Sequence, residues 1–309
     1  MQPPRPLHLA VFGPGLIGGS VALAARRGGL CARLAVWSRD EAERTAARRR
    51  AGADLVTADP AEAAADADLL VLCTPPAALP GLARAVAPHL RPDAAVCDVA
   101  SVKAGVVEEL TAIFDRPGGS RYAGAHPMAG AERHGLAAAR ADLFAGSVCL
   151  LTPHARTALD ALSTVETFWR GLGSRVHQLS PAAHDEAVAL VSHLPHTVAA
   201  ALAAFVGAGP GGGAAALACA GPNWWGMTRV AAGSPELWTE ILSRNRGPVT
   251  HALRGLIGKL LDVLELVETG RDADLEAFLD EARMRRGASL PPADPAESSI
   301  PPNSSVETS

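Results

Sequence analysis

The sequence predicts an α/β protein in which a mainly parallel sheet is followed by an all-helical region. Two observations carry this prediction. Short apolar runs alternate with amphipathic stretches of roughly ten to fifteen residues up to about residue 180, a spacing typical of strand–helix–strand units. Beyond that point the alternation stops, and only helical periodicity continues to about residue 285.

The apolar runs predict five strands, of which the third is weak. The cores of these runs are apolar, which fits a parallel sheet covered by helices on both faces. The predicted strands are residues 7–12, 34–37, 55–56, 69–73 and 94–97, and the helices between them are residues 16–27, 41–51 and 79–89.

The C-terminal part predicts a long helix at residues 181–206 with an interior proline, Pro195, which should bend it. Further helices are expected at residues 214–220, 235–245, 247–268 and 273–285, after a glycine-rich break at 207–213. The last residues are rich in proline and serine, a composition typical of disorder. We therefore expect three parts, namely residues 1–179, 180–286 and 287–309.

Composition excludes several classes of protein. The chain has 309 residues, a net charge of −4 and one short basic run, Arg48 to Arg50, so we expect no nucleic-acid partner. The five cysteines are odd in number and far apart, which favours free thiols in the reducing cytoplasm over disulfides or zinc. We expect no membrane span, on the reasoning that no uncharged run approaches the required ~20 residues.

A glycine motif lies between the first predicted strand and helix. Gly13, Gly15 and Gly18 have the G-x-G-x-x-G spacing of a Rossmann dinucleotide-binding turn. In such a turn the glycines allow the tight bend, the approach of the pyrophosphate and close packing of the helix. The expected cofactor contacts are Gly13, Gly15, Leu16, Ile17, Gly18, Ser38, Arg39, Thr74, Pro75 and Ser101.

The end of the second strand indicates which nucleotide binds. An acidic residue there accepts hydrogen bonds from the ribose hydroxyls of NAD and repels the 2′-phosphate of NADP. Ser38 occupies this position and is followed by Arg39, whose planar guanidinium suits a phosphate. We therefore expect NADP, with NAD as the alternative if Asp40 turns toward the ribose.

Four further groups of residues carry chemistry. They are Asp98-Val-Ala-Ser101-Val-Lys103 after the fifth strand, His126-Pro-Met-Ala-Gly with Glu132 after a short strand, Ser192-His-Leu-Pro-His196 in the long helix, and Thr228-Arg229 before Pro235-Glu-Leu-Trp238. Each has a plainer explanation. Asp98 and Ser101 suit a helix cap, and Arg229 suits a surface. His193 and His196 share a helix face, but no third metal ligand is evident, so we expect no metal.

In combination, these motifs and the turn GPGLIGGS at residues 13–20 occur in the order and spacing of one family. The chain resembles the prephenate/arogenate dehydrogenases of tyrosine biosynthesis over roughly residues 7–285. The resemblance implies oxidative decarboxylation of a cyclohexadienol, with hydride transfer to NAD(P)⁺. It also implies a homodimer with a small-molecule substrate.

The resemblance assigns roles to individual residues. His126 matches the base that accepts the proton of the ring 4-hydroxyl, and Ser101 matches a serine bonded to that histidine or that hydroxyl. Arg229 matches the arginine that grips the ring carboxylate. Ser192 and His196 match residues of the substrate pocket, and Glu132 lies where the family faces the substrate side chain.

The chain also departs from the family pattern. Trp224-Trp225-Gly226 replaces a basic–acidic pair that precedes the Thr-Arg in many relatives, so substrate entry and side-chain selection need not follow theirs. Two other interpretations remain open. One is another Rossmann-plus-helices reductase, such as a β-hydroxyacid dehydrogenase or imine reductase. The other is a regulator that senses NADP(H) without turnover.

Overall fold

A computed structural model describes residues 5–130, 135–207 and 213–288. The chain divides into two compact units, residues 1–252 and 253–309. The second unit holds most of α12 (Arg246–Glu268) and all of α13 (Asp272–Ala288), joined through Gly270, whose φ is +65°. The first unit holds all of the residues that the sequence singled out for function.

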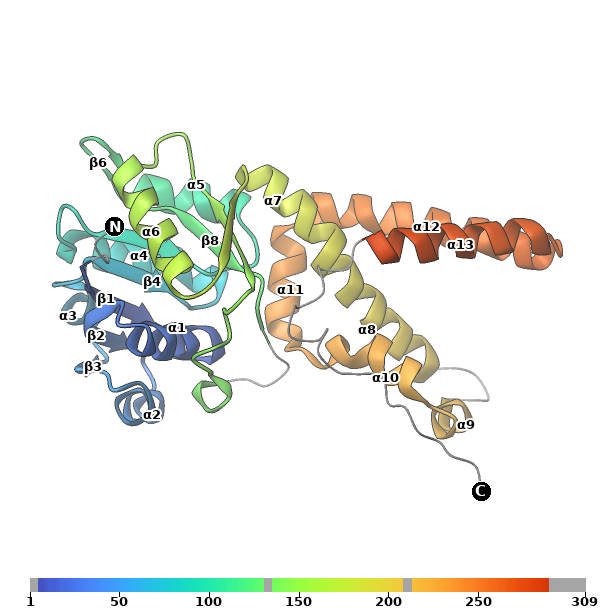
Figure 1. The fold of residues 1–309 in the computed structure, drawn as a ribbon, viewed down its shortest axis with the longest axis horizontal. Coiled ribbons are helices and arrows are strands. Elements are labelled where there is room, and N and C mark those ends of the chain that lie inside the picture. Colours follow the sequence, from blue (N-terminus) through green and yellow to red (C-terminus); the bar gives the residue numbers. More distant parts are fainter. Residues whose placement is uncertain (1–4, 131–134, 208–212, 289–309) are drawn as a thin grey trace, which may run out of the picture. The chain divides into compact units, whose positions relative to one another are not determined.

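The first unit is built on a five-stranded parallel sheet with the strand order β3-β2-β1-β4-β5 (Figure 1). The strands are β1 (Leu7–Phe12), β2 (Cys31–Trp37), β3 (Leu55–Thr57), β4 (Leu69–Leu72) and β5 (Ala95–Asp98). All four strand pairings are parallel, with Val11 of β1 opposite Val36 on one side and Val71 on the other. The predicted parallel sheet is therefore confirmed, including its weak third strand.

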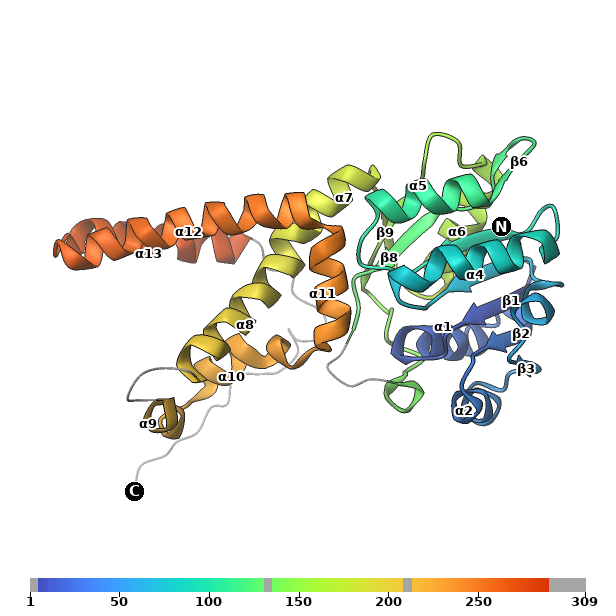
Figure 2. The ribbon, with the colours of Figure 1, turned by 180° about the vertical axis from the view of Figure 1, so that it is seen from behind.

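Helices cover both faces of this sheet. Successive residues of a strand point to opposite faces, so each strand contributes side chains to two separate cores. Leu9 and Val11 belong to one core cluster, while Ala10 and Phe12 belong to another. The first cluster includes residues of α1 (Leu16–Arg27), α2 (Glu41–Ala51) and α6 (Leu159–Gly171), and the second includes residues of α3 (Pro60–Ala64), α4 (Leu79–Val86) and α5 (Ala104–Ile113). Figures 1 and 2 show these two layers from opposite sides.

A smaller sheet extends the first unit beyond β5. Its strands are β8 (Gly124–Pro127), β9 (Val148–Thr152) and β10 (Arg175–Gln178), and a short hairpin is formed by β6 (Asp115–Arg116) and β7 (Gly119–Ser120). β8 runs antiparallel to β9, and β9 runs parallel to β10. His126 lies within β8 rather than after a strand, so its position is fixed by backbone pairing with Leu150.

The predicted long helix exists but changes its pitch. It consists of α7 (Pro181–Val188), a π-helical turn (Ala189–His193) and α8 (Leu194–Gly207). Pro195 has no N–H to donate to the carbonyl four residues earlier, and wide turns of this kind absorb such a break. The remaining helices of the first unit are α9 (Gly213–Ala218), α10 (Pro222–Thr228), a 3₁₀ turn (Arg229–Ala232) and α11 (Pro235–Arg244).

The expectation that no uncharged run approaches the length of a membrane span is wrong. The continuous helix Pro181–Gly207 is long and apolar enough to cross a membrane, with a mean hydropathy of 1.6 over its most apolar stretch. The core helix of a soluble protein passes the same test, so length and composition alone decide nothing here. This helix carries four buried polar residues, His184, Asp185, His193 and His196.

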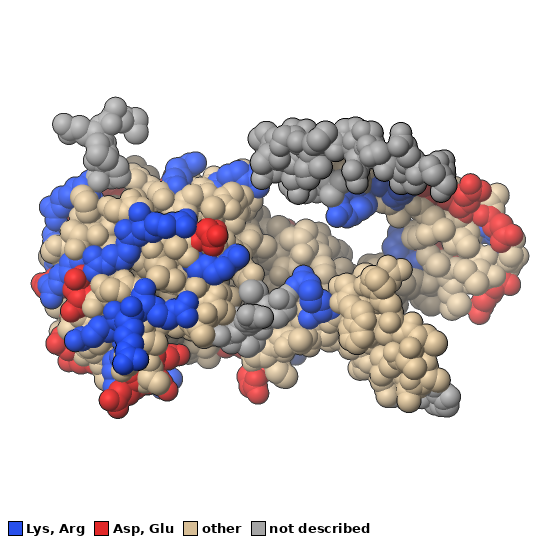
Figure 3. Space-filling model, turned by 60° about the horizontal axis from the view of Figure 1, so that its bottom comes forward, with Lys and Arg blue, Asp and Glu red and all other residues tan. Residues whose placement is uncertain are grey.

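The basic run of α2 faces solvent, as expected. Arg48, Arg49 and Arg50 are exposed in its last turn, where cations oppose the negative end of the helix dipole. Figure 3 shows lysine and arginine side chains on this half of the molecule interspersed with acidic ones. The face in this view therefore carries side chains of both signs.

Candidate active site

The turn between β1 and α1 has the geometry that the glycine motif predicts. Gly13 has a φ of +90°, and a Cβ there would lie 2.9 Å from the carbonyl oxygen of Cys73. A Cβ on Gly18 would collide with the carbonyl of Gly13, whereas a Cβ on Gly15 would meet nothing within 4 Å. The backbone is thus packed at Gly13 and Gly18 and open at Gly15. This arrangement fits the pyrophosphate of a dinucleotide.

One cleft connects this turn to the helical part of the first unit. Its walls include Gly15, Leu16 and Ile17 from the turn and His196, Arg229 and Trp238 from the helices. Cys73 also lines it, and the next residue, Thr74, has a buried hydroxyl without a hydrogen-bond partner in the described part of the chain. A bound nucleotide can satisfy such a group. The cleft thus brings together part of the expected set, with Gly15, Leu16 and Ile17 on the cofactor side and His196 and Arg229 on the substrate side.

The end of β2 holds an acidic group that the sequence analysis did not weigh. The Ser38 hydroxyl donates to Glu43 Oε2 at 2.6 Å. Asp40 caps α2 by accepting from the Glu43 N–H at 3.0 Å, so its carboxylate is engaged in the helix terminus. Arg39 is exposed beside them, and Arg44 Nη1 donates to the Ser38 and Arg39 carbonyls. The end of β2 thus carries one carboxylate, Glu43, bonded to Ser38, and one exposed guanidinium, Arg39.

His126 is 7% exposed and takes part in a chain of hydrogen bonds. Its Nδ1 lies 2.8 Å from His184 Nε2, and His184 Nδ1 lies 2.8 Å from Asp185 Oδ1. Burial lowers the pKa of His126 well below its usual value, and the nearby Lys103 ammonium lowers it further. The imidazole is therefore neutral at pH 7 and able to accept a proton.

The loop after β5 is held by a fully buried ion pair. Lys103 Nζ donates to Asp98 Oδ2 at 2.6 Å and to the Ala100 carbonyl, and both charged side chains are 0% exposed. Tyr122 Oη donates to the other oxygen of Asp98 at 2.7 Å. Removing one partner of such a pair leaves an uncompensated buried charge. This pair fixes the loop that carries Ser101, whose side chain makes no hydrogen bond within the described residues.

The long helix presents a histidine to the cleft. The His196 ring stacks on Trp238 of α11, with ring centroids 3.4 Å apart. His193 is buried, its Nδ1 is 3.0 Å from Asn245 Nδ2, and burial lowers its pKa to about 4. Ser192 is half-buried in the π-helical turn and is not among the residues lining the cleft. His196 thus reaches the expected place, and Ser192 lies next to it along the helix.

Arg229 begins the 3₁₀ turn after α10 and lines the cleft. Trp225 of the unusual Trp-Trp-Gly stretch is 63% exposed on α10. Glu132, which the resemblance places beside the substrate side chain, lies outside the described residues.

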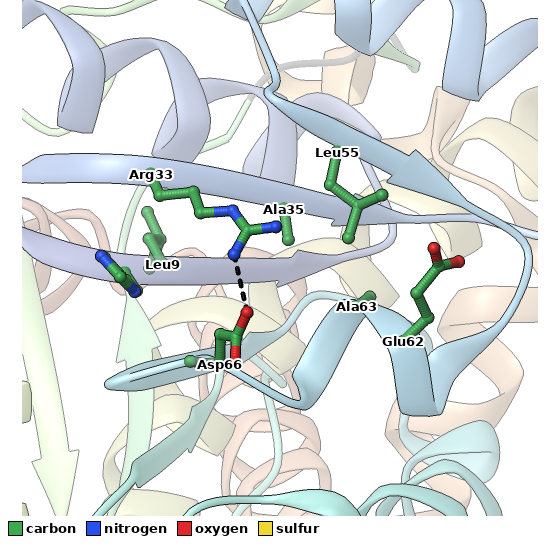
Figure 4. A pocket seen from close by; sticks show the side chains of 9 residues that line it. Leu9, Arg33, Ala35, Leu55, Glu62, Ala63 and Asp66 are labelled. Atoms are coloured by element: carbon green, nitrogen blue, oxygen red, sulfur yellow. Dashed lines mark hydrogen bonds and ion pairs between the residues drawn. The ribbon is translucent and has the colours of Figure 1, made fainter.

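A metal-binding group and a second pocket were also considered as sites. Among the described residues, no group of three or more His, Cys, Asp and Glu side chains is arranged to hold a metal. The pocket in Figure 4 lies beside β1, β2 and α3, where Arg33 Nη1 and Asp66 Oδ2 pair with each other at 2.7 Å. None of the expected site residues lines that pocket.

The sequence analysis missed His184, Asp185, Tyr122 and Asn245. The signal for the first two was the pair of adjacent polar residues at the start of an otherwise apolar helix. Their burial depends on how α7 packs against α5 and β9. Local sequence therefore does not distinguish them from a solvated helix start.

A dinucleotide turn on a parallel sheet that opens into a cleft, in a unit that also holds a buried neutral histidine, is typical of the nicotinamide-nucleotide-dependent dehydrogenases. The chain belongs to the prephenate dehydrogenase family. Residues 21–178 match the family's nucleotide-binding domain, and residues 180–281 match its dimerization domain. The resemblance inferred from the motifs is confirmed, and with it the family reaction, NAD(P)-linked oxidative decarboxylation.

Curated relatives support the same assignment over most of the chain. The cyclohexadienyl dehydrogenase of Zymomonas mobilis is 33% identical over 281 residues, covering 90% of this chain and 94% of that protein. The prephenate dehydrogenase of Bacillus subtilis is 28% identical over 279 residues, covering 89% of this chain and 74% of that one.

Solved structures of similar proteins support the same family assignment. Prephenate dehydrogenase from Aquifex aeolicus, in complex with hydroxyphenyl propionate and NAD⁺, has a TM-score of 0.86 at 27% identity and covers 93% of this chain and 99% of that one. Arogenate dehydrogenase from Synechocystis has a TM-score of 0.78 at 30% identity, covering 91% and 99%. A 3-hydroxyisobutyrate dehydrogenase from Salmonella typhimurium, at 17% identity and 0.55, shows the shared fold alone. The two other interpretations left open by the sequence are therefore not favoured.

Proposed function

We propose that this chain oxidatively decarboxylates arogenate, prephenate or both, with His126 as general base and Arg229 as the carboxylate-binding residue. The observation that carries the proposal is the single cleft that joins the glycine turn to His196, Arg229 and Trp238. The Zymomonas, Bacillus and Synechocystis relatives, named for cyclohexadienyl, prephenate and arogenate substrates, support this substrate class. Assaying purified protein with each substrate and NADP⁺ at 340 nm tests it.

The roles follow from the chemistry of these side chains. When bound, the oxidised nicotinamide supplies the acceptor for the hydride from the ring C4. Neutral His126 accepts the proton of the C4 hydroxyl, and the Ser101 hydroxyl forms a hydrogen bond with that same oxygen. The Arg229 guanidinium fixes the ring carboxylate until carbon dioxide leaves. His196 forms the helical side of the substrate pocket, and Ser192 lies one turn earlier on the same helix.

We predict that arogenate is used at least as well as prephenate. The two differ in one side chain, which ends in an ammonium-bearing amino acid in arogenate and in a keto acid in prephenate. The carboxylate of Glu132 attracts the ammonium group and repels the keto acid. An exposed pair of this kind contributes up to about 1 kcal/mol, and more when desolvated. The missing basic–acidic pair at Trp224-Trp225-Gly226 removes one cation that would help to hold prephenate.

The measurement is kcat/KM for both substrates in the wild type and in Glu132→Gln. We expect the ratio to shift toward prephenate by about five-fold, corresponding to the upper value above. Glu108→Gln, an exposed glutamate of α5, serves as the control that changes charge without touching the site. An unchanged ratio in Glu132→Gln would mean that Glu132 does not read the side chain.

We propose NADP⁺ as the preferred nucleotide. Arg39 is exposed at the end of β2, and Asp40, the residue that would serve NAD, is engaged in capping α2. The Glu43 carboxylate bonded to Ser38 acts in the opposite direction, because it repels a 2′-phosphate. The guanidinium outweighs it if Arg39 can form the planar two-bond contact that arginine makes with phosphate.

The double variant Ser38→Asp with Arg39→Ala should reverse the preference, since it adds an acceptor for the ribose hydroxyls and removes the phosphate ligand. Glu43→Gln should instead raise the NADP⁺ preference. Arg48→Ala, in the exposed last turn of α2, is the matched control for loss of one positive charge. A wild-type protein with tenfold higher kcat/KM for NAD⁺ would contradict the proposal.

We propose that the chain forms a homodimer through its helical part. The match to a dimerization domain supports this, as do large apolar side chains exposed on its helices. They include Phe205, Trp225 and Met227 in the first unit and Leu260 and Leu264 in the second. Light scattering at micromolar concentration should give twice the chain mass of 31.7 kDa, and a monomer at that concentration would refute the proposal.

We also propose that the protein is cytoplasmic. Its proposed partners are its small-molecule substrate and a second copy of the chain. All five cysteines are free, with Cys31, Cys97 and Cys149 buried, which suits a reducing compartment.

A further inference from the structure

We propose that His184 and Asp185 are positioning residues that set the tautomer of His126, so that its Nε2 is the unprotonated nitrogen. The proposal rests on the role of His126 given above, and it concerns a state of the imidazole that can be measured without activity. The three side chains are connected by two contacts of 2.8 Å, and all three are buried.

Asp185 determines the protonation of the two histidines, because its carboxylate only accepts hydrogen bonds when it is ionised. The Lys103 N–H donates to Oδ1 and the Ala104 N–H donates to Oδ2, each at 2.8 Å. Burial alone would raise the pKa of Asp185, but the bonds from His184 and these two N–H groups outweigh it and hold the pKa below its usual range. The carboxylate is therefore ionised at neutral pH, and His184 Nδ1 must donate to it.

The protonation of His184 then fixes that of His126. Burial lowers the pKa of His184, so the ring is neutral and carries a single proton. With that proton on Nδ1, its Nε2 is an acceptor, and His126 Nδ1 must donate to it across the 2.8 Å contact. His126 is also neutral, so its own Nε2 keeps a free lone pair. Reversing both tautomers would place the bare Nδ1 of His184 against the carboxylate of Asp185, a contact of two acceptors.

The same carboxylate also fixes the loop that carries Ser101. Its two backbone bonds reach the first residues of α5, directly after Ser101-Val102, from a residue of α7 that is 81 and 82 positions away. Asn245 Nδ2 donates to the Asp185 carbonyl at 2.8 Å and holds α7 in place. One side chain thus orients the base and the serine that are proposed to meet the same substrate hydroxyl.

No proton needs to move to Asp185 when His126 acts as the base. When His126 Nε2 takes the proton of the substrate hydroxyl, the ring becomes an imidazolium whose Nδ1–H still donates to His184. The electron pair of the hydroxyl O–H bond forms the new C=O bond as the hydride leaves C4 for the nicotinamide. His184 and Asp185 stabilise the positive charge that develops on His126. Among the residues that the structure describes, the other charged or titratable groups that act on these two rings are Lys103, Asp98 and His193.

The first test is ¹⁵N NMR of histidine-labelled wild-type protein at neutral pH, with the His126 signals identified by their loss in His126→Asn. Imidazole ¹⁵N shifts separate protonated from unprotonated nitrogens. We expect Nδ1 of His126 to be protonated and Nε2 to be bare. A protonated Nε2 would overturn the inference whatever the activity, whereas full activity of His126→Asn would overturn only the role of His126 as base.

The second test is His184→Phe, which keeps a buried ring and removes both nitrogens. We expect a fall in kcat of about 10- to 100-fold, the effect usual for partners that orient a reacting group. KM for substrate and nucleotide should change less than threefold, and the His126 ¹⁵N signals should show a mixture of tautomers. His177→Gln, on an exposed histidine of β10, is the control. Unchanged kcat and tautomer in a folded His184→Phe protein would contradict the proposal.

Discussion

Replacing His126 with asparagine should abolish most of the turnover while substrate and nucleotide still bind. Asparagine keeps a polar group of similar size in β8 but cannot accept a proton at neutral pH. General-base catalysis of this kind contributes about 10²–10⁴-fold, so kcat should fall by that factor. His126 is buried and bonded to His184, so we expect its replacement by asparagine to leave the residues that line the cleft in place. Steady-state kinetics and titration with NADP⁺ measure the two quantities separately.

The pH profile gives an independent check on the same residue. Burial and the Lys103 ammonium lower the pKa of His126, so the neutral base persists below the usual histidine pKa of 6.5. kcat/KM should therefore stay level down to pH 6.5 and fall only at lower pH, as the ring gains its proton. The His126→Asn protein should lack this acidic limb. Normal turnover by the asparagine variant would show that another group is the base.

Arg229→Ala should raise KM for the substrate by about 10²-fold with a smaller change in kcat. The ring carboxylate is bound in the ground state as well as during reaction, so removing its partner weakens both states alike. The Arg229 guanidinium is exposed, and a substrate bound over it would desolvate the charge pair. Loss of one partner of a pair in that state costs about 2–5 kcal/mol, and 2.8 kcal/mol corresponds to a hundredfold. Measurement of kcat and KM at saturating nucleotide gives the two effects.

Two further variants make this result specific. Arg229→Lys keeps the charge but loses the planar fork, so its KM should lie between those of the wild type and the alanine variant. Arg244→Ala removes an arginine of α11 that pairs with Glu240 and should leave KM unchanged. A fall in kcat with KM unaltered in Arg229→Ala would mean that Arg229 acts during the chemical step and does not bind the ground-state carboxylate.

Local patterns in the sequence were enough to predict the nucleotide-binding half. The strand from Leu7 to Phe12 is apolar because both of its faces are buried, and the turn at Gly13 needs a backbone conformation that glycine adopts easily. Helix ends were also readable, as at Asp40, whose side chain caps α2 at the predicted start. In each case the deciding interactions lie within a few residues along the chain.

Hydropathy was less informative in the helical half. The helix Pro181–Gly207 is apolar enough for a membrane, yet it carries the buried residues His193 and His196. An apolar run is the same in composition whether lipid or protein covers it. The sequence predicted the length of this helix and its disturbance near Pro195, but not the π-helical turn that precedes the proline.

By itself, then, the sequence determined the α/β class, the dinucleotide turn and the family, because each depends on residue types at fixed spacings. Only the tertiary structure decided which polar residues are buried together. His184 meets His126 across 58 positions, and Asp185 reaches the Lys103 N–H across 82. Lys103 and Asp98 are fully buried although charged residues are usually exposed, because each neutralises the other. Such groups are identified by three-dimensional packing, since their free energy depends on the partners that surround them and not on their neighbours along the chain.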